Sequence, residues 1–259
     1  EKMYPDNIFA VHLDHGDEQT CYDCIKSGFY SSVMIDASHE SFLENIAITQ
    51  RISSKAHQRG ISVEAELGML GGVEEDINID EKHAMLTDPD EAKEFVNASE
   101  CDSLAVAIGT SHGAYKFTRP PTGDILAIER IKEIHKRIPN THLVMHGSSS
   151  VPQDLLKIIN DHGGAIKETY GVPVKEIQEG IKHGVRKVNI DTDLRLASTA
   201  AIRKHFVKNP AQFDPRKYLS DTMNEMKKIV MSRLEEFGTA GNADKIRPIS
   251  LEKMVDRYK

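Results

Sequence analysis

Three histidines, each followed directly by a glycine, stand at the ends of three separate short hydrophobic runs. They are His15, His112 and His146. Each run is typical of a short buried strand, and parallel neighbouring strands would bring the three imidazoles together at one end of a sheet. Three histidines with one open position form a catalytic zinc arrangement. Each histidine alone is more typical of a partly buried polar residue without a functional role, so the prediction depends on their shared position and on the carboxylates beside them.

Carboxylates accompany these histidines. Asp14 precedes His15, and the end of a strand relaxes the rule that adjacent side chains point to opposite faces. A carboxylate beside a metal-bound substrate suits acid–base work on a hydroxyl group. Asp36 and Glu66 each end a candidate strand, where they would bind a metal or orient a ligating histidine. A helix cap or a solvated strand end is an equally good interpretation of either residue alone.

Small and hydroxyl residues follow the last two candidate strands, in segments 147–150 and 189–193. Such turns expose backbone N–H groups that bind anions, and barrel enzymes often bind phosphate after their last two strands. Four basic side chains are candidates for a second phosphate, although most surface Lys and Arg have no such role. These four are Lys116, Arg119, Arg195 and Arg216.

Hydrophobic runs alternate with longer amphipathic segments, which favours βαβ units and a parallel sheet. The expected strands are 8–13, 32–36, 61–65, 104–108, 142–145 and 185–190, and the expected helices between them are 40–57, 89–98, 124–137 and 174–183. A closed parallel barrel needs eight strands. We therefore expect an α/β protein with a (β/α)8 TIM barrel whose first two strand–helix units, about 30 residues each, belong upstream of this chain.

An open, doubly wound six-stranded sheet is the alternative fold, and the absence of a GxGxxG motif counts mildly against it. We expect a single domain, in which residues 1–191 form the barrel portion. Residues 192–259 would form a helical C-terminal extension with long helices at 192–208 and 218–237. Such an extension often covers a barrel or builds a subunit interface, and a plain solvated helical tail is the simpler interpretation.

Two long loops are expected at 77–84 and 109–123. The first is preceded by the glycine-rich segment 68–72 and the acidic run 74–76. Glycine hinges and an acidic tip suit a mobile lid that carries a catalytic carboxylate, whereas an isolated acidic run is more often a solvated turn.

The composition is that of an ordinary globular protein of 259 residues, with 39% hydrophobic and 28% charged residues. The net charge of -7 argues against a nucleic-acid-binding surface. No apolar stretch approaches the roughly 20 residues that span a bilayer, and no signal-peptide pattern opens the chain. The three cysteines indicate a reducing compartment, and we interpret Cys21 and Cys24 as residues on a helix face rather than a redox or zinc pair.

Taken together, these segments resemble the class II, zinc-dependent fructose-1,6-bisphosphate aldolases, in particular the long-chain subgroup of Calvin-cycle and some glycolytic bacterial enzymes. The matching segments run in family order over nearly the whole chain: 12–16, 64–68, 109–116, 146–150, 187–193 and 214–216. The resemblance implies a cytoplasmic homodimer or larger homo-oligomer. It also implies reversible cleavage of fructose 1,6-bisphosphate into dihydroxyacetone phosphate and glyceraldehyde 3-phosphate.

The resemblance also implies roles for individual residues. The three histidines match the ligands of the catalytic Zn²⁺, and Asp14 matches the residue that acts on the C4 hydroxyl. Glu75 matches the loop residue that moves the proton at C3, although the loop spacing varies among relatives, so Glu74 is an alternative. Asp36 and Glu66 match a second divalent metal position that is variably occupied.

The substrate positions are implied in the same way. Arg216 matches an arginine that reaches the other phosphate from the partner subunit, and Lys116 lies in a matching segment as a further substrate-binding candidate. Six positions match those that hold the dihydroxyacetone-phosphate half and a nearby monovalent cation, Na⁺ or K⁺. They are Gly113, Gly147, Ser149, Asn189, Asp191 and Thr192. The serine and asparagine that relatives supply from their first strands are missing here.

Three other functions stay open. Tagatose 1,6-bisphosphate differs from the fructose substrate at C4, next to Asp14, although segment 214–216 and the long C-terminal extension favour the fructose enzyme. A zinc hydrolase also uses three ligands and a glutamate, but it would not need two anion sites. A non-catalytic phosphosugar-binding barrel would not need Asp14 and the histidines together.

Overall fold

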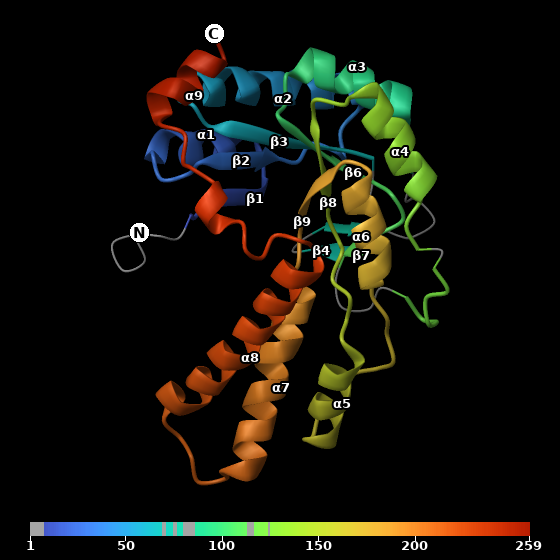
Figure 1. The fold of residues 1–259 in the computed structure, drawn as a ribbon, viewed down its shortest axis with the longest axis vertical. Coiled ribbons are helices and arrows are strands. Elements are labelled where there is room, and N and C mark those ends of the chain that lie inside the picture. Colours follow the sequence, from blue (N-terminus) through green and yellow to red (C-terminus); the bar gives the residue numbers. More distant parts are fainter. Residues whose placement is uncertain (1–7, 69–70, 75–76, 80–85, 113–116, 124) are drawn as a thin grey trace.

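The centre of the molecule is a six-stranded, fully parallel sheet with the strand order β1-β2-β3-β6-β8-β9 (Figure 1). The computed structural model describes residues 8–68, 71–74, 77–79, 86–112, 117–123 and 125–259. The strands are β1 His12–Gly16, β2 Ser32–Ile35, β3 Ser62–Leu67, β6 Ser103–Val106, β8 His142–Met145 and β9 Val185–Val188. All six predicted strands are present, and β1 begins later than expected, at His12.

Five helices follow the strands and cover one face of the sheet (Figure 1). They are α1 Glu18–Ser27, α2 Phe42–His57, α3 Pro89–Ser99, α4 Ile128–Arg137 and α6 Val174–Lys182. Each packs against the next one around the sheet. Asp17 caps the start of helix α1, where its side chain accepts a hydrogen bond from the Thr20 amide, and Gly28 caps the end in the left-handed conformation. Cys21 and Cys24 lie on this helix, as predicted, and both are buried.

One face of the sheet is apolar, and the other carries both apolar and buried polar side chains. Val63, Leu104 and Leu143 point toward the helices and belong to the main hydrophobic core. Their neighbours along the strands point the other way because successive side chains lie on opposite faces. Glu64 and His146 belong to this second set and are buried. The face of the sheet away from the helices therefore carries the polar chemistry.

The two edge strands approach each other through side chains on that polar face. Lys187 Nζ of β9 lies 3.1 Å from His12 Nε2 of β1, and Asn189 donates a hydrogen bond of 3.0 Å to Asp14 Oδ1. Edge strands of a flat sheet lie too far apart for such contacts, because neighbouring strands are spaced about 4.8 Å apart. The sheet is therefore curled like part of a barrel, and the doubly wound alternative is wrong, since that fold has helices on both faces.

A small second sheet has the order β5-β4-β7. Its strands are β4 Gly71–Glu74, β5 Ile77–Ile79 and β7 Ser111–His112. The expected loop 77–84 thus begins as a strand that pairs antiparallel with β4, while β4 pairs parallel with β7. The three-residue pattern Ile-Asn-Ile was too short beside a glycine-rich segment to predict a strand.

A helical unit extends away from the sheet (Figure 1). It consists of α5 Gln153–Asp161, α7 Thr192–Lys208 and α8 Pro215–Glu236. Leu155 and Ile159 of α5 pack against Leu196 and Ala200 of α7 in a second hydrophobic cluster. Helix α7 has the predicted bounds, and α8 begins three residues before the predicted helix, at a proline capped by Asp214.

The chain then returns to the sheet as helix α9, Leu251–Arg257 (Figure 1). The Tyr258 ring stacks on His57 of α2, with centroids 3.8 Å apart. The Tyr258 hydroxyl donates a hydrogen bond of 2.9 Å to Asp102, just before β6. These contacts tie the end of the chain to the side of the sheet where the strands begin. None of the helices in the described part of the chain is long and apolar enough to cross a membrane.

Candidate metal and substrate site

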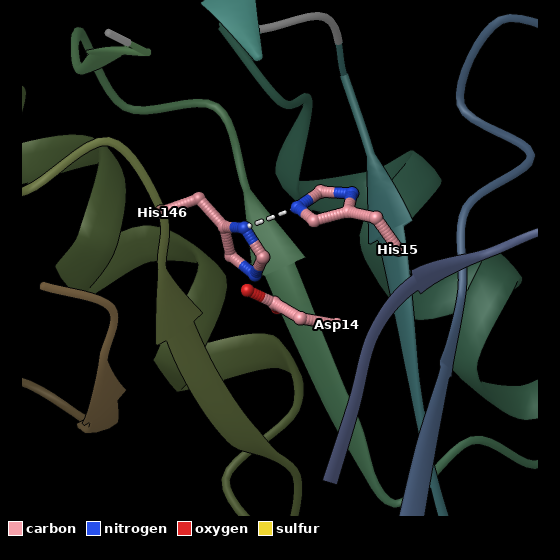
Figure 2. Close-up of side chains that lie close together, drawn as sticks. All are labelled: Asp14, His15 and His146. Carbon is pink, nitrogen blue, oxygen red and sulfur yellow. Dashed lines mark hydrogen bonds between the residues drawn. The ribbon is translucent and has the colours of Figure 1, made fainter. Parts of the chain in front are cut away.

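A bulge at the end of β1 turns two adjacent side chains toward the same place. Leu13 pairs with Val33, but Gly16 pairs with Ile35, so β1 has one residue more than β2 in this stretch. His15 takes up this extra residue with a φ of 83°, in the left-handed region that non-glycine residues rarely adopt. Both Asp14 and His15 consequently face the concave side of the sheet (Figure 2).

His15 and His146 meet on this concave side. His15 Nε2 lies 2.9 Å from His146 Nδ1, and the two rings are nearly perpendicular at 88° (Figure 2). A carboxylate oxygen of Asp14 completes a group whose ligand atoms all lie within 4.8 Å of one another. His146 is fully buried, whereas the Asp14 side chain is 52% exposed. The structure thus brings together two of the three histidines predicted as metal ligands, His15 of β1 and His146 directly after β8, with Asp14 beside them.

The other ring nitrogen of each histidine, the one that faces away from the histidine pair, contacts a buried carboxylate. His15 Nδ1 and Asp36 Oδ2 are 2.8 Å apart, and so are His146 Nε2 and Glu64 Oε1. Burial raises the pKa of Asp36, but hydrogen bonds from His15 and Ser38 outweigh it and hold the pKa at about 2. Burial likewise raises the pKa of Glu64, and His146 with Lys187 outweighs it and holds that pKa at about 2.

These carboxylates determine which ring nitrogen carries the proton. An ionised carboxylate only accepts hydrogen bonds. If both rings are neutral, the proton of His15 lies on Nδ1 and that of His146 lies on Nε2. The other two ring nitrogens, His15 Nε2 and His146 Nδ1, are 2.9 Å apart, and in this neutral state each presents a lone pair to the other. Ligating histidines in metal sites are typically held by carboxylates in this way.

Asp36 and Glu66 form a second group together with His15, and their ligand atoms also lie within 4.8 Å of one another. Both carboxylates are buried. The two residues predicted for a second divalent metal are thus brought together, and His15 is common to both groups.

A third group lies one layer deeper in the curled sheet and was missed by the sequence analysis. It contains His12, Asp14 and Glu64. Lys187 Nζ lies within the group, 2.8 Å from Glu64 Oε2 and 3.1 Å from His12 Nε2. Burial lowers the pKa of His12, and the ammonium group of Lys187 lowers it further. The available signal was spacing, since His12 and Glu64 each precede a predicted site residue by two positions on the same strand.

The two expected phosphate-binding segments lie at the ends of β8 and β9. Gly147 adopts a φ of 61°, and Ser149 is buried. The amides of Ser150 and Val151, however, donate to the fully buried carboxylate of Asp193 on α7, at 3.1 and 2.8 Å. Asp193 therefore fixes this turn from inside, a role that the sequence analysis missed because an Asp in the first turn of a helix suggests only dipole stabilisation.

The residues predicted in segment 189–193 have different surroundings. Asn189 points to Asp14, as described above, and Thr192 is the buried first residue of α7. Asp191 pairs with Arg195 at 2.9 Å, and both side chains face solvent. Asn189 thus holds the side chain of Asp14, whereas the Asp191 carboxylate is directed to the surface.

Arg216 is not brought to the site of its own chain. It is 87% exposed at the start of α8 and pairs with Asp214. Helix α7, which is 17 residues or about 25 Å long, separates it from the end of β9. Three further predicted residues, Gly113, Lys116 and Glu75, lie outside the described residues, as do the side chains of Glu74 and His112. The His112 backbone is described and pairs with Gly72.

A parallel α/β sheet that curls around strand-end histidines and carboxylates defines a barrel-type enzyme with the side chains of a metal site. Comparison with known proteins identifies the family: residues 3–242 match the profile of class II fructose-bisphosphate aldolase, and the chain belongs to this family. The resemblance inferred from the sequence is thereby confirmed.

Individual relatives agree with this assignment. The chain is 57% identical to the fructose-bisphosphate aldolase of Xanthobacter flavus, over 99% of this chain and 77% of that protein. It is 55% identical to the fructose-bisphosphate aldolase of Nostoc sp., over 99% and 76%. A crystal structure of a Coccidioides immitis protein assigned as a fructose-1,6-bisphosphate aldolase superposes with a TM-score of 0.71 at 25% identity, over 93% of this chain and 75% of that one. The TIM-barrel-like fold of class II aldolases is therefore also that of this chain.

Proposed function

We propose that this protein is a zinc-dependent aldolase that reversibly cleaves fructose 1,6-bisphosphate into dihydroxyacetone phosphate and glyceraldehyde 3-phosphate. The observation that carries the proposal is the close approach of two imidazole nitrogens, His15 Nε2 and His146 Nδ1, which lie 2.9 Å apart beside the Asp14 carboxylate. The membership of the chain in the class II fructose-bisphosphate aldolase family supports it further. We place the enzyme in the cytoplasm, in glycolysis, gluconeogenesis or the Calvin cycle.

The donor set fits zinc. Two lone pairs that face each other at this distance repel unless a proton or a cation lies between them, and neutral imidazoles are preferred zinc ligands. Asp36 and Glu64 fix both rings in the ligating tautomer. His112 would be the third ligand. Zinc bound here would act as a Lewis acid that polarises the substrate carbonyl and stabilises negative charge on its oxygen.

Asp14 would be the base for the C4 hydroxyl. Its carboxylate is half-exposed next to the histidine pair, and Asn189 holds it by a hydrogen bond to Oδ1. Asp14 would remove the hydroxyl proton, the C3–C4 bond would break, and C4 would become the aldehyde carbon of glyceraldehyde 3-phosphate. Glu75, or alternatively Glu74, would then deliver a proton to C3 of the other product.

Substrate and ion binding complete the proposal. Gly147, Ser149 and the start of α7 would bind the phosphate of the dihydroxyacetone half through backbone N–H groups. A monovalent cation, Na⁺ or K⁺, would bind nearby, and a second divalent metal would use His15, Asp36 and Glu66. The other proposed substrate contacts are Asn189, Asp191, Thr192, Gly113 and Lys116, with Arg216 supplied by the partner subunit of a homodimer or larger homo-oligomer.

We further propose that two more strand–helix units close the barrel between β9 and β1. In the described part of the chain both strands are sheet edges without a backbone partner on their outer side. The alignment with the Xanthobacter flavus relative covers 77% of that protein, so the relative is longer than the matching region. In this proposal residues 1–191 form the rest of the barrel, and residues 192–259 form a helical extension of the same domain.

The direct test is cleavage of fructose 1,6-bisphosphate, followed through the triose phosphates, before and after treatment with EDTA and after zinc is added back. We expect activity that is lost with EDTA and restored by zinc. A folded, zinc-loaded protein that cleaves only tagatose 1,6-bisphosphate would change the assigned substrate. One that cleaves neither bisphosphate would refute the proposed function.

A further inference from the structure

The polar layer below the histidine pair contains a set of metal-ligating atoms with a lysine among them. His12 Nε2 lies 3.7 Å from Glu64 Oε2 and 4.0 Å from Asp14 Oδ1. Such a cluster of one imidazole and two carboxylates would attract a divalent cation. Lys187 Nζ contacts both Glu64 and His12, so a positively charged group is already in the cluster.

The charge of Glu64 explains why a cation is required there. Its side chain is only 2% exposed, and a buried carboxylate without a counter-charge is strongly destabilising. Lys187 reaches it from β9, across the concave side of the sheet, and remains 36% exposed. A lysine can serve here because its long apolar stem packs on the sheet while the ammonium group reaches the carboxylate.

Glu64 also connects this lysine to the proposed metal site. One of its oxygens, Oε2, accepts a hydrogen bond from Lys187, and the other, Oε1, accepts one from His146 Nε2. With both oxygens engaged, the carboxylate has one fixed orientation. That orientation holds the His146 ring with Nδ1 toward His15.

We propose that Lys187 is a positioning residue of the metal site: it is the resident cation of the His12, Asp14 and Glu64 cluster, it fixes Glu64 behind His146, and it keeps a metal ion out of that cluster. The positioning part rests on the proposed function, because it takes His146 as a zinc ligand. The cluster from which the metal ion is excluded does not contain His15, although it shares Asp14 with the group of Asp14, His15 and His146.

The test is zinc binding by the metal-stripped full-length protein, titrated against a chromophoric chelator. Lys187→Met is expected to weaken the first zinc site about 10- to 100-fold, the usual effect of losing support behind a ligand. It is also expected to bind one zinc ion more than the wild type, because the cluster has lost its cation. Lys187→Arg keeps a cation and should bind the wild-type number of zinc ions.

Two further variants keep the result interpretable. Glu64→Gln combined with Lys187→Met removes both buried charges, so it should fold even if the single variant does not. It should bind the wild-type number of zinc ions with the first site still weakened. Lys182→Met, which removes an exposed lysine paired with Glu179, is the matched control and should leave zinc binding unchanged.

Four outcomes would count against the inference. The inference would be overturned if Lys187→Met binds zinc with the same affinity and the same stoichiometry as the wild type. Weaker binding without the additional zinc ion would overturn the assignment of Lys187 as the cation of the cluster, and unweakened binding in the double variant would overturn its positioning role. A wild-type protein that binds no zinc would refute the proposed function together with the inference.

Discussion

The backbone at His15 illustrates how one residue determines what a strand end can do. In a regular strand, Asp14 and His15 would lie on opposite faces, and only one of them would reach the substrate. The bulge in β1 and the positive φ of His15 place both on the concave side. A residue held in this conformation costs about 1–3 kcal/mol, which the hydrogen bond to Asp36 and burial against the sheet offset.

Replacing Asp14 should separate chemistry from metal binding. Asp14→Asn keeps the size of the side chain and its contact with Asn189 but cannot take up the hydroxyl proton. We expect cleavage to fall by about 10²- to 10⁴-fold while bound zinc, measured by elemental analysis, is unchanged. Asp23→Asn, at an exposed position on α1, serves as the control. Wild-type turnover by the Asp14 variant would show that another residue is the base.

The carboxylate behind His15 should make the metal-free protein sensitive to acid. The pKa of Asp36 is about 2 in the folded protein, whereas its ordinary pKa is 3.8. The ionised carboxylate therefore contributes its full stabilisation at pH values above 3.8, and this stabilisation is lost as the pH falls toward 2. Between about pH 5 and pH 2, it should account for about 2 kcal/mol of lost unfolding free energy.

Urea unfolding of wild type and Asp36→Asn over this pH range measures the effect. The variant should be less stable near neutral pH and should lose less stability on acidification. Equal losses in both proteins would show that Asp36 does not carry this dependence. Asp23→Asn should follow the wild type throughout.

Sequence patterns reveal some of the residues at the site but not others. Asp14, His15 and His146 were predictable because each ends a hydrophobic run. Glu64 and Lys187 were not, because a charged residue inside a short strand run does not show which partner will neutralise it. Their pairing depends on the curling of the sheet, which brings β9 opposite β1 and β3.

At the scale of elements, a buried ion pair joins α7, α8 and the turn after β8. Asp193 is fully buried, accepts from the amides of Ser150 and Val151, and receives a hydrogen bond of 2.9 Å from Arg233 of α8. The helical unit and the proposed phosphate-binding turn are therefore one connected structure.

Removing Arg233 would leave Asp193 without its cation. Arg233→Met should lower the free energy of unfolding by about 3–5 kcal/mol, as is typical when one partner of a buried pair is lost. Urea unfolding checks this value. Lys228→Met, which breaks an exposed pair with Glu225 on the same helix, should cost less than about 1 kcal/mol. Similar losses in both variants would mean that the Asp193 pair contributes no more than a surface pair.

Tyr258, directly after helix α9, joins the end of this helix to α2 and to Asp102. Burial raises the pKa of Tyr258, and Asp102 raises it further, so the hydroxyl remains a donor at neutral pH. Tyr258→Phe should cost about 1 kcal/mol for the lost hydrogen bond, whereas Tyr258→Ala also removes the stack on His57. Hydrogen exchange of 251–257 should be slightly faster in the first variant and much faster in the second. Unchanged exchange in the alanine variant would show that other contacts hold the helix.

Most elements were predictable because long amphipathic or apolar segments determine them locally. The core strands and α7 lie close to where periodicity placed them. Helix α5 and strand β5 were not predicted, because each is short and lies beside glycine or proline residues that interrupt the pattern. That α5 packs with α7 and α8, away from the barrel helices, depends on tertiary contacts alone.

At the scale of the whole molecule, Arg216 provides a test of how subunits combine. Its exposed position at the far end of α7 and α8 leaves it far from its own site. If it completes the partner's site, Asp14→Asn and Arg216→Met chains, each nearly inactive alone, should form mixed dimers in which one of the two sites is intact.

Refolding the two variants together should therefore restore about a quarter of wild-type activity, because half of the dimers are mixed and each has one intact site. Mixing two preparations of the same variant is the control. Different tags on the two variants verify that mixed dimers have formed. If these mixed dimers recover no activity, Arg216 does not act across a subunit interface.

Helix α8 is 22 residues long, a rod of about 33 Å, with Arg216 in its first turn and Arg233 in its last. Arg233 fixes the turn after β8 in its own chain through Asp193, while Arg216 is proposed to bind a phosphate in the partner. In a dimer, helix α8 of each subunit would connect the active site of its own chain with the active site of the partner. Occupancy of one site should then change the affinity of the other, and reciprocity requires that the second site change the first by the same factor.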